Sequence, residues 1–148
     1  MKPVKHVLQD KGTDIWDIAP DVSVFAAIEL MSEKEVGALL VLDAQKLVGI
    51  ISERDYTRKV ILEGRSSKET LVKAIMTSPV ICTDADQPID VCMALMTEKR
   101  IRHLPVLENG ELIGVVSLGD LVRTIISEQE SQIRGLESYI LYQSDMPQ

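Results

Sequence analysis

The stretch Gly49-Ile50-Ile51-Ser52-Glu53-Arg54-Asp55 decides the fold, because its pattern returns 65 residues later as Gly114-Val115-Val116-Ser117-Leu118-Gly119-Asp120. The repetition extends beyond these two phrases. Residues 21–61 align without a gap on residues 86–126, with about 14 identities in roughly 41 positions. This self-similarity indicates that the chain holds two copies of one structural unit, and we expect the two copies to share one function.

Hydrophobic spacing predicts the same elements in each copy. Each copy has one amphipathic helix, whose apolar residues recur at helical spacing and are expected to face the core. These residues are Val24, Ala27, Ile28 and Met31 in the first copy, and Ile89, Cys92, Met93 and Met96 in the second. Two apolar runs follow in each copy, at 38–42 and 47–51 and at 104–107 and 112–116, and turn-like residues at 43–46 and 108–111 predict hairpins. Shorter leading strands are expected at 15–18 and 80–83.

Each copy therefore reads strand, helix, strand, strand, helix, which predicts an α+β fold built from two β-α-β-β-α repeats. The predicted parts are 1–62 (an N-terminal segment and the first repeat), 63–76 (a linker and a short helix), 77–126 (the second repeat) and 127–148 (a C-terminal helix and tail). Short helices at 4–8 and 71–76 are expected to enter the first and second copies. A unit of about 50 residues buries too little surface to be comfortably stable, so we expect the copies to pack sheet to sheet with pseudo-twofold symmetry. Their clefts would then occur twice.

Composition excludes several classes of protein. The chain has 148 residues, a net charge of −7 and 3% aromatic residues, which disfavours binding to nucleic acid through phosphates or stacked bases. No apolar run reaches the roughly 20 residues of a membrane span, and the first residues lack the apolar stretch of a secretion signal. We therefore expect a cytoplasmic protein with no membrane partner. Cys82 and Cys92 have no counterparts in the first copy, so we predict neither a disulfide nor a metal site.

The repeated phrase has two chemical interpretations. Serine followed three residues later by a carboxylate is typical of a helix start, where the side chains satisfy free amides. The alternative is a nucleotide site, in which serine and helix amides hold phosphate and aspartate accepts from the two hydroxyls of a ribose. Gly49 and Gly114 have the usual explanation of a glycine in a strand, a bulge or a close approach, and would also let a ligand lie against the backbone.

At these residues the chain resembles a tandem pair of CBS domains, the cystathionine-beta-synthase type of repeat, also called a Bateman module. The resemblance covers residues 11–126 and rests mainly on the two Ser-x-x-Asp phrases. It also includes Ile15-Trp16-Asp17-Ile18-Ala19-Pro20-Asp21, the helix ends at 31–34 and 96–99, and Arg102-His103-Leu104-Pro105-Val106. It implies a regulatory module that performs no chemistry and binds an adenine nucleotide as effector: AMP, ADP, ATP, NAD(H) or S-adenosylmethionine.

The resemblance also implies particular site residues. Asp55 and Asp120 would hold ribose hydroxyls, and Ser52 and Ser117 would contact phosphate. Adenine would lie against the leading strand of the opposite copy. The residues implied there are Thr13, Ile15, Gly37 and Ala38 for the Asp120 cleft, and Ser78, Val80 and Leu104 for the Asp55 cleft.

Basic residues near the phrases distinguish the two copies. Arg102 and His103 stand where similar modules place groups that face phosphates, with a solvated arginine and a hydrogen-bonded strand histidine as the structural alternative. Arg54 lies inside the first phrase, where the second has Gly119. Residues 58 and 59 are instead expected on a solvated helix face. The two clefts should therefore not be equivalent.

These features favour a nucleotide-sensing module that reports energy or redox state to an unidentified target protein, or through its own homodimer. Two alternatives stay open: an interaction protein with vestigial clefts, and a nucleotide hydrolase that uses Asp55 or Asp120 with His103. The expected C-terminal helix carries Ile133, Leu136 and Ile140 on one side, a stripe that could pack on the body or on a partner chain.

Overall fold

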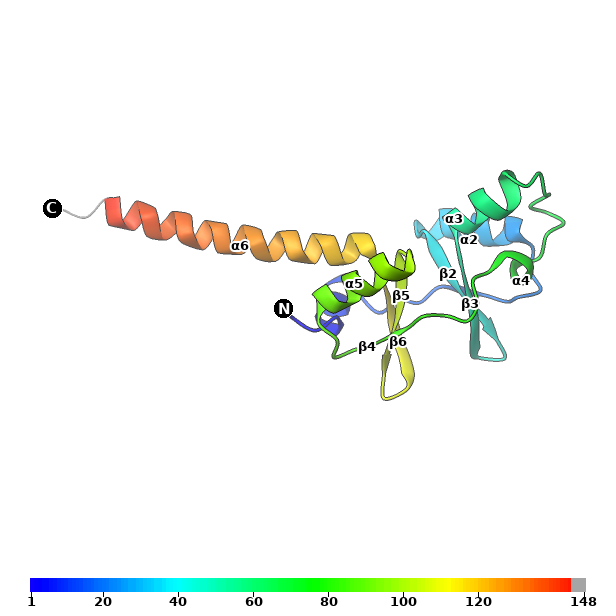
Figure 1. Cartoon of the computed structure of the whole chain (residues 1–148), viewed down its shortest axis with the longest axis horizontal. Helices are drawn as coiled ribbons and strands as arrows, with labels where there is room; N and C mark the ends of the chain where they lie inside the picture. The colour runs from blue at the N-terminus through cyan, green and yellow to red at the C-terminus, as the bar shows by residue number, and fades with distance from the viewer. Residues whose placement is uncertain (145–148) are drawn as a thin grey trace. The chain divides into compact units, whose positions relative to one another are not determined.

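The computed structural model describes the backbone of residues 1–144 and the side chains of residues 1–134. The chain divides into two units, each containing one three-stranded sheet. The first-repeat unit consists of Asp14–Cys82, and the second-repeat unit consists of Met1–Thr13 together with Thr83–Gln148. The α+β class and the two repeats of the prediction are confirmed (Figure 1).

The first-repeat unit has the sheet order β1-β2-β3, in which β1 runs parallel to β2 and β2 runs antiparallel to β3. Its elements are β1 (Asp17–Ile18), α2 (Val24–Lys34), β2 (Ala38–Asp43), β3 (Lys46–Ser52), α3 (Glu53–Tyr56), the π-helical turn η1 (Thr57–Ile61) and α4 (Val72–Ile75). The leading strand is shorter than predicted, because only Asp17 and Ile18 pair with β2.

The second-repeat unit repeats this arrangement with the order β4-β5-β6. Its elements are α1 (Lys5–Lys11), β4 (Thr83–Asp84), α5 (Ile89–Lys99), β5 (His103–Glu108), β6 (Glu111–Ser117) and α6 (Leu118–Ser144). The leading strand is displaced from the predicted 80–83, since β4 meets β5 only at Thr83 and Asp84. The predicted helix after the second phrase is confirmed, and it extends without a break to Ser144.

Both predicted hairpins are present, and their turns explain their sequences. Ala44 and Gln45 have φ values of 49° and 68°, and Asn109 and Gly110 have 52° and 79°. Two consecutive residues with positive φ match the twist of the flanking strands, which is why Asn-Gly is favoured there. Each hairpin places its second strand so that the Ser-x-x-Asp phrase follows at the strand's end.

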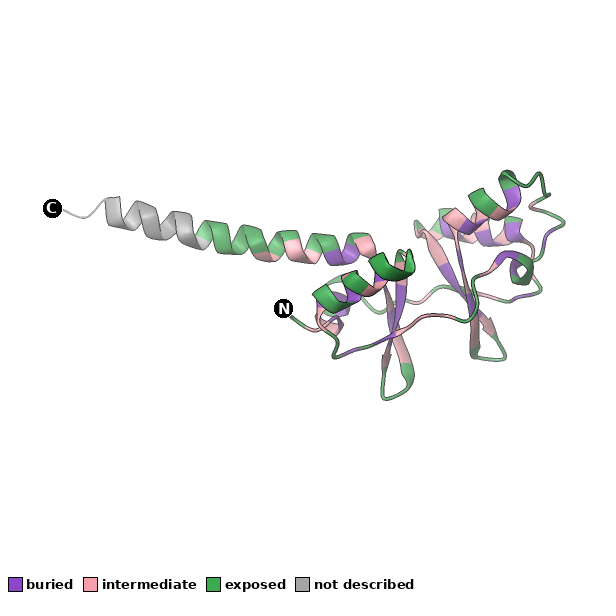
Figure 2. Ribbon diagram, viewed as in Figure 1, coloured by how far each residue is buried: buried purple, intermediate pink, exposed green. Residues whose placement is uncertain are grey.

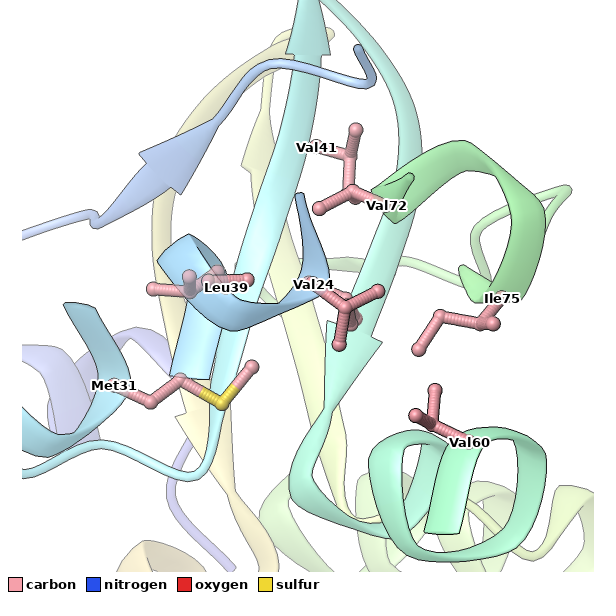
Figure 3. Packing of buried hydrophobic residues seen from close by; sticks show 9 residues of the cluster. Val24, Met31, Leu39, Val41, Val60, Val72 and Ile75 are labelled. Carbon is pink, nitrogen blue, oxygen red and sulfur yellow. The ribbon is translucent and has the colours of Figure 1, made fainter. Parts of the chain in front are cut away.

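The core of the first-repeat unit lies between its sheet and its helices. Val24 and Met31 of α2 are buried together with Leu39 and Val41 of β2 and with apolar residues of η1 and α4 (Figure 3). The predicted stripes face the cores of both units, since Val24, Ala27 and Met31 are buried in α2, and Ile89, Cys92 and Met96 in α5. Cys82 and Cys92 are both free thiols.

The short helices pack differently from the prediction. The segment at 4–8 does not enter the first copy: α1 belongs to the second-repeat unit, where Val4 N–H donates to the Gln87 carbonyl at 2.8 Å and Lys5 N–H to the Ala85 carbonyl at 3.1 Å. The segment at 71–76 likewise stays with the first repeat, where Val72 N–H donates to the Val22 carbonyl at 2.8 Å. Val4, Val7 and Leu8 are buried, and the N-terminal segment groups with the second repeat, whereas the predicted domain boundaries stay predictions.

The longest helix of the described chain carries no apolar span. Among the described residues, none of the helices combines the length and the hydropathy that crossing a membrane requires.

Candidate functional site

The first phrase forms a capping box at the junction of β3 and α3. Ser52 has extended backbone angles, and its Oγ accepts from the Asp55 N–H at 3.2 Å. The Asp55 Oδ2 accepts from the Ser52 N–H at 3.0 Å and from the Ser52 hydroxyl at 3.1 Å. Asp55 is only 9% exposed. The helix-start interpretation of the phrase is therefore confirmed, and it holds a buried carboxylate in one orientation.

The second phrase has the same geometry at the junction of β6 and α6. The Asp120 Oδ2 accepts from the Ser117 N–H at 2.8 Å, and the Ser117 Oγ accepts from the Asp120 N–H at 3.1 Å. Asp120 is buried to the same extent as Asp55. Both repeats thus present a fixed, largely buried carboxylate at the end of a strand.

Around Asp55, a cation and a hydroxyl converge on the same carboxylate oxygen. Lys59 Nζ lies 3.0 Å from Asp55 Oδ1, and the Thr77 hydroxyl donates to that oxygen at 3.4 Å. Lys59 Nζ also donates to the Ile75 carbonyl at 2.9 Å. The prediction of a solvated helix face holds only in part for Lys59, whose side chain is 41% exposed but pairs with Asp55, and its place one helical turn after Asp55 is the sequence signal for that pair. Thr77 comes from a distant segment, and only the fold shows its role.

Around Asp120, two cations contact the carboxylate. Lys11 Nζ lies 2.7 Å from Oδ2 and donates to the Val115 carbonyl at 2.6 Å, while Arg123 Nη2 donates to Oδ1 at 2.6 Å. Burial alone would raise the pKa of the Asp120 carboxyl, but hydrogen bonds from Lys11 and from the Ser117 backbone outweigh it, so this pKa lies below its ordinary value. Asp120 is therefore ionised at neutral pH. Asp120 and Arg123 are three residues apart, so sequence spacing could have predicted their contact. Lys11 belongs to α1, which is far away in sequence.

The glycines of the phrases are explained by packing on one side. A Cβ at Gly49 would meet Met76 Sδ at 2.5 Å and the Thr77 carbonyl at 3.2 Å, and a Cβ at Gly114 would meet the two Leu8 methyl carbons at 2.7 and 2.8 Å. Close approach is thus confirmed, and the strand register also shifts beside each glycine, which bears out the bulge. Side chains cover the strand on that side, and a ligand lying against the backbone at either glycine stays a prediction.

Several other predicted residues lie beside the phrases within their own units. Ala38 pairs with Ser52, and the Gly37 carbonyl accepts from the Glu53 N–H at 3.0 Å. His103 pairs with Ser117, and the Arg102 carbonyl accepts from the Leu118 N–H at 2.8 Å. Arg102 is exposed and Arg54 is half-buried. The basic pair of the second repeat thus borders the Asp120 phrase.

The implied adenine contacts are placed only in part. Ser78 directly follows Thr77, which contacts Asp55, and Thr13 lies two residues after Lys11, which contacts Asp120. Ser78 and Thr13 are exposed, Ile15 and Val80 are half-buried, and Leu104 is fully buried. The implied pairings of Ile15, Gly37 and Ala38 with Asp120, and of Leu104 with Asp55, stay predictions.

Two α+β repeats, each with a capped helix that holds a buried aspartate beside basic side chains, define a tandem CBS pair. The CBS domain family model matches residues 13–61 and 72–127, and the chain belongs to this family as a CBS-pair regulatory module. A mitochondrial CBS domain-containing protein of Arabidopsis thaliana is 40% identical over 147 residues, which cover 93% of this chain and 71% of that protein.

Solved structures show the same fold. A CBS-domain protein from Burkholderia ambifaria superposes with a TM-score of 0.83 at 50% identity, covering 86% of this chain and 96% of that one. A CBS-CP12 protein from bloom-forming cyanobacteria, described as hexameric, has a TM-score of 0.74 at 25% identity and covers 82% of this chain and 70% of that one.

Proposed function

We propose that this CBS pair binds an adenine nucleotide as an effector, with Asp55 and Asp120 accepting hydrogen bonds from ribose hydroxyls. The observation that carries the proposal is the pair of buried carboxylates, each fixed by a capping box and each contacted by the amine of a lysine, Lys59 or Lys11. An ionised carboxylate is an acceptor with two oxygens, which suits the two adjacent hydroxyls of a ribose.

The basic groups around the aspartates are proposed to bind the phosphates of the nucleotide. The Arg123 side chain is 72% exposed and the Lys11 side chain is 37% exposed, whereas Asp120 is buried. We propose that ribose hydroxyls, as donors, replace one or both of these contacts, so that the buried carboxylate stays hydrogen-bonded, and that the freed cations stay close enough to bind phosphate oxygens. In the first repeat Lys59 has the equivalent role, and Arg54 and Ser52 are proposed to contact phosphate.

We further propose that binding regulates a target protein or the protein's own homodimer. A ligand shifts an equilibrium between two conformations only by its difference in affinity for them. Lys11 could give rise to such a difference. It connects the Asp120 carboxylate to α1, so a ribose that replaces Lys11 changes what holds the end of that helix. The hexameric assembly of the cyanobacterial CBS-CP12 protein supports self-association as an output.

Calorimetric titration of nucleotide-stripped protein with AMP, ATP, NADH and S-adenosylmethionine tests this function. We expect saturable heat with at least one of them at submillimolar concentration, and no steady release of phosphate from ATP. Asp55→Asn and Asp120→Asn keep the side-chain shape but remove the charge, and each should weaken one site.

Asp86→Asn is the matched control, because Asp86 is 76% exposed and pairs with Lys5 at the surface of the same unit as Asp120. Heat with none of the four ligands would overturn the proposal. Phosphate release from ATP that both aspartate variants abolish would replace it with the hydrolase.

A further inference from the structure

The apolar side chains on the outer part of α6 are exposed. Leu121, in the first turns of α6, is fully buried, whereas Ile126 is 48% exposed and Ile133 is 54% exposed. Residues 129–134 are all exposed (Figure 2). Among the residues whose side chains the structure describes, Ile126 and Ile133 are therefore not buried by packing against their own unit.

The spacing of these residues is that of a coiled coil. Val122, Ile126, Gln129 and Ile133 follow one another at intervals of four, three and four residues, and the sequence continues the alternation with Leu136 and Ile140. In heptad terms Ile occupies the a positions 126, 133 and 140, and Val, Gln and Leu occupy the d positions 122, 129 and 136. β-Branched residues at a with Leu at d favour two parallel strands, and here Ile fills the three a positions while Leu fills one of the three d positions.

The charges of the helix lie outside this seam. Glu128, Glu130 and Arg134 all fall at other heptad positions, and Glu130 and Arg134 form an ion pair along the helix at 3.4 Å. An uncharged seam is complementary to a copy of itself, and Gln129 is a polar d residue that would meet its own counterpart in a parallel pair. Such a polar pair inside a seam fixes the register of the two strands.

The composition of the outer helix also calls for a partner. Residues 127–138 include three serines, two glutamines and Gly135, none of which is a strong helix former apart from glutamine. Helices in proteins owe most of their stability to packing of an apolar face rather than to the helix propensity of their residues. A second copy supplies that packing along the whole seam.

We propose that α6 pairs with α6 of a second copy of this chain as a parallel, in-register coiled coil that begins near Ile126. The pairing gives the module a defined self-association surface. It specifies the partner in the proposed homodimer and does not depend on nucleotide binding.

Disulfide trapping tests the register. In a Cys82→Ser background, Gln129→Cys places a thiol in the seam and Ser131→Cys places one two residues away on the outer face. Because a disulfide requires Cα atoms within about 7 Å, we expect Gln129→Cys to cross-link between chains about tenfold faster than Ser131→Cys. Adding Ile133→Asp should abolish this advantage, whereas adding Arg134→Asp, outside the seam, should preserve it.

Equal rates for the two cysteine variants would overturn the proposal, as would an advantage that survives Ile133→Asp. Titration of the Ile133→Asp variant with nucleotide separates the two proposals. If the Ile133→Asp variant loses cross-linking but keeps its nucleotide-binding heat, the substitution acts on α6 alone. If the Gln129→Cys protein binds nucleotide but forms no cross-link, the coiled coil is refuted and the proposed nucleotide binding is not.

Discussion

Replacing Gly114 by alanine tests the attachment of the N-terminal helix to the second repeat. The added Cβ would lie 2.7 and 2.8 Å from the two Leu8 methyl carbons, closer than carbon atoms pack. Leu8 is only 3% exposed, so its side chain has little room to withdraw. Extra methyl groups in well-packed cores reduce the free energy of unfolding by about 1–3 kcal/mol, and we expect Gly114→Ala to fall in that range.

Urea unfolding followed by circular dichroism measures this loss. Leu8→Ala should itself destabilise by about 2–5 kcal/mol, but it removes the colliding methyl groups. The double variant should therefore be more stable than the sum of the two single losses predicts, with a coupling of about 0.5–3 kcal/mol.

Gly119→Ala is the matched control. Its added Cβ would meet the Arg123 guanidinium at 3.3 Å, which is the far end of an exposed, flexible side chain that can shift by a few tenths of an ångström while it keeps its bond to Asp120. We expect this change to be neutral or to stabilise α6 by about 0.5–1 kcal/mol, since alanine is the better helix former. A Gly114→Ala protein as stable as the wild type, or additive effects with Leu8→Ala, would refute the packing of α1 on β6.

Two further predictions concern the phrases themselves. Because the pKa of Asp120 is lower in the folded state, its contribution to stability is present above the unfolded pKa of about 3.9 and is lost as the pH falls through the folded value. Urea unfolding at a series of acidic pH values should show this loss in the wild type and less of it in Asp120→Asn. Identical pH profiles for the two proteins would contradict this prediction. Ser52→Ala and Ser117→Ala each remove a cap and should reduce the free energy of unfolding by about 1 kcal/mol, whereas exposed Ser131→Ala should change it little, and three equal effects would argue against the caps.

Local signals were sufficient to predict the elements of each repeat. The hairpin at 108–111 follows from Asn109-Gly110, both of which have positive φ. The helix starts follow from the Ser-x-x-Asp spacing, which produces the same reciprocal hydrogen bonds in both copies. The core faces of α2 and α5 follow from apolar residues three and four positions apart. In each case residues close in sequence determine the structure.

Local signals could not predict which repeat each short helix packs on. Val4, Val7 and Leu8 form an apolar stripe that fits either repeat equally well by pattern alone. The choice depends on hydrogen bonds to the Gln87 and Ala85 carbonyls and on the close contact with Gly114. These partners lie about 80 residues or more away in sequence, beyond any periodicity.

The residues of the candidate site likewise fall into two groups, those that local sequence signals predict and those that only the fold reveals. The repeated phrase predicts four of them: Ser52, Asp55, Ser117 and Asp120. Lys59 and Arg123 lie at helical spacing from the aspartates, so their contacts could also be predicted from sequence. The contacts of Lys11 and Thr77 could not be predicted, because these residues approach the carboxylates from other segments of the fold. Sequence thus identified the carboxylates, and the fold added the groups that hold them.

The affinity for a ligand without ribose hydroxyls tests the central claim most directly. The dissociation constant of the best-binding adenine nucleotide should be compared with that of its 2′,3′-dideoxy form, for the wild type and for Asp55→Asn with Asp120→Asn. Hydrogen bonds to a charged group contribute about 1.5–3 kcal/mol each, so the wild type should favour the ribose form by at least about tenfold. The variant should lose most of this preference. Equal affinities for the two forms in the wild type, or a preference that the variant retains, would contradict the placement of ribose on Asp55 and Asp120.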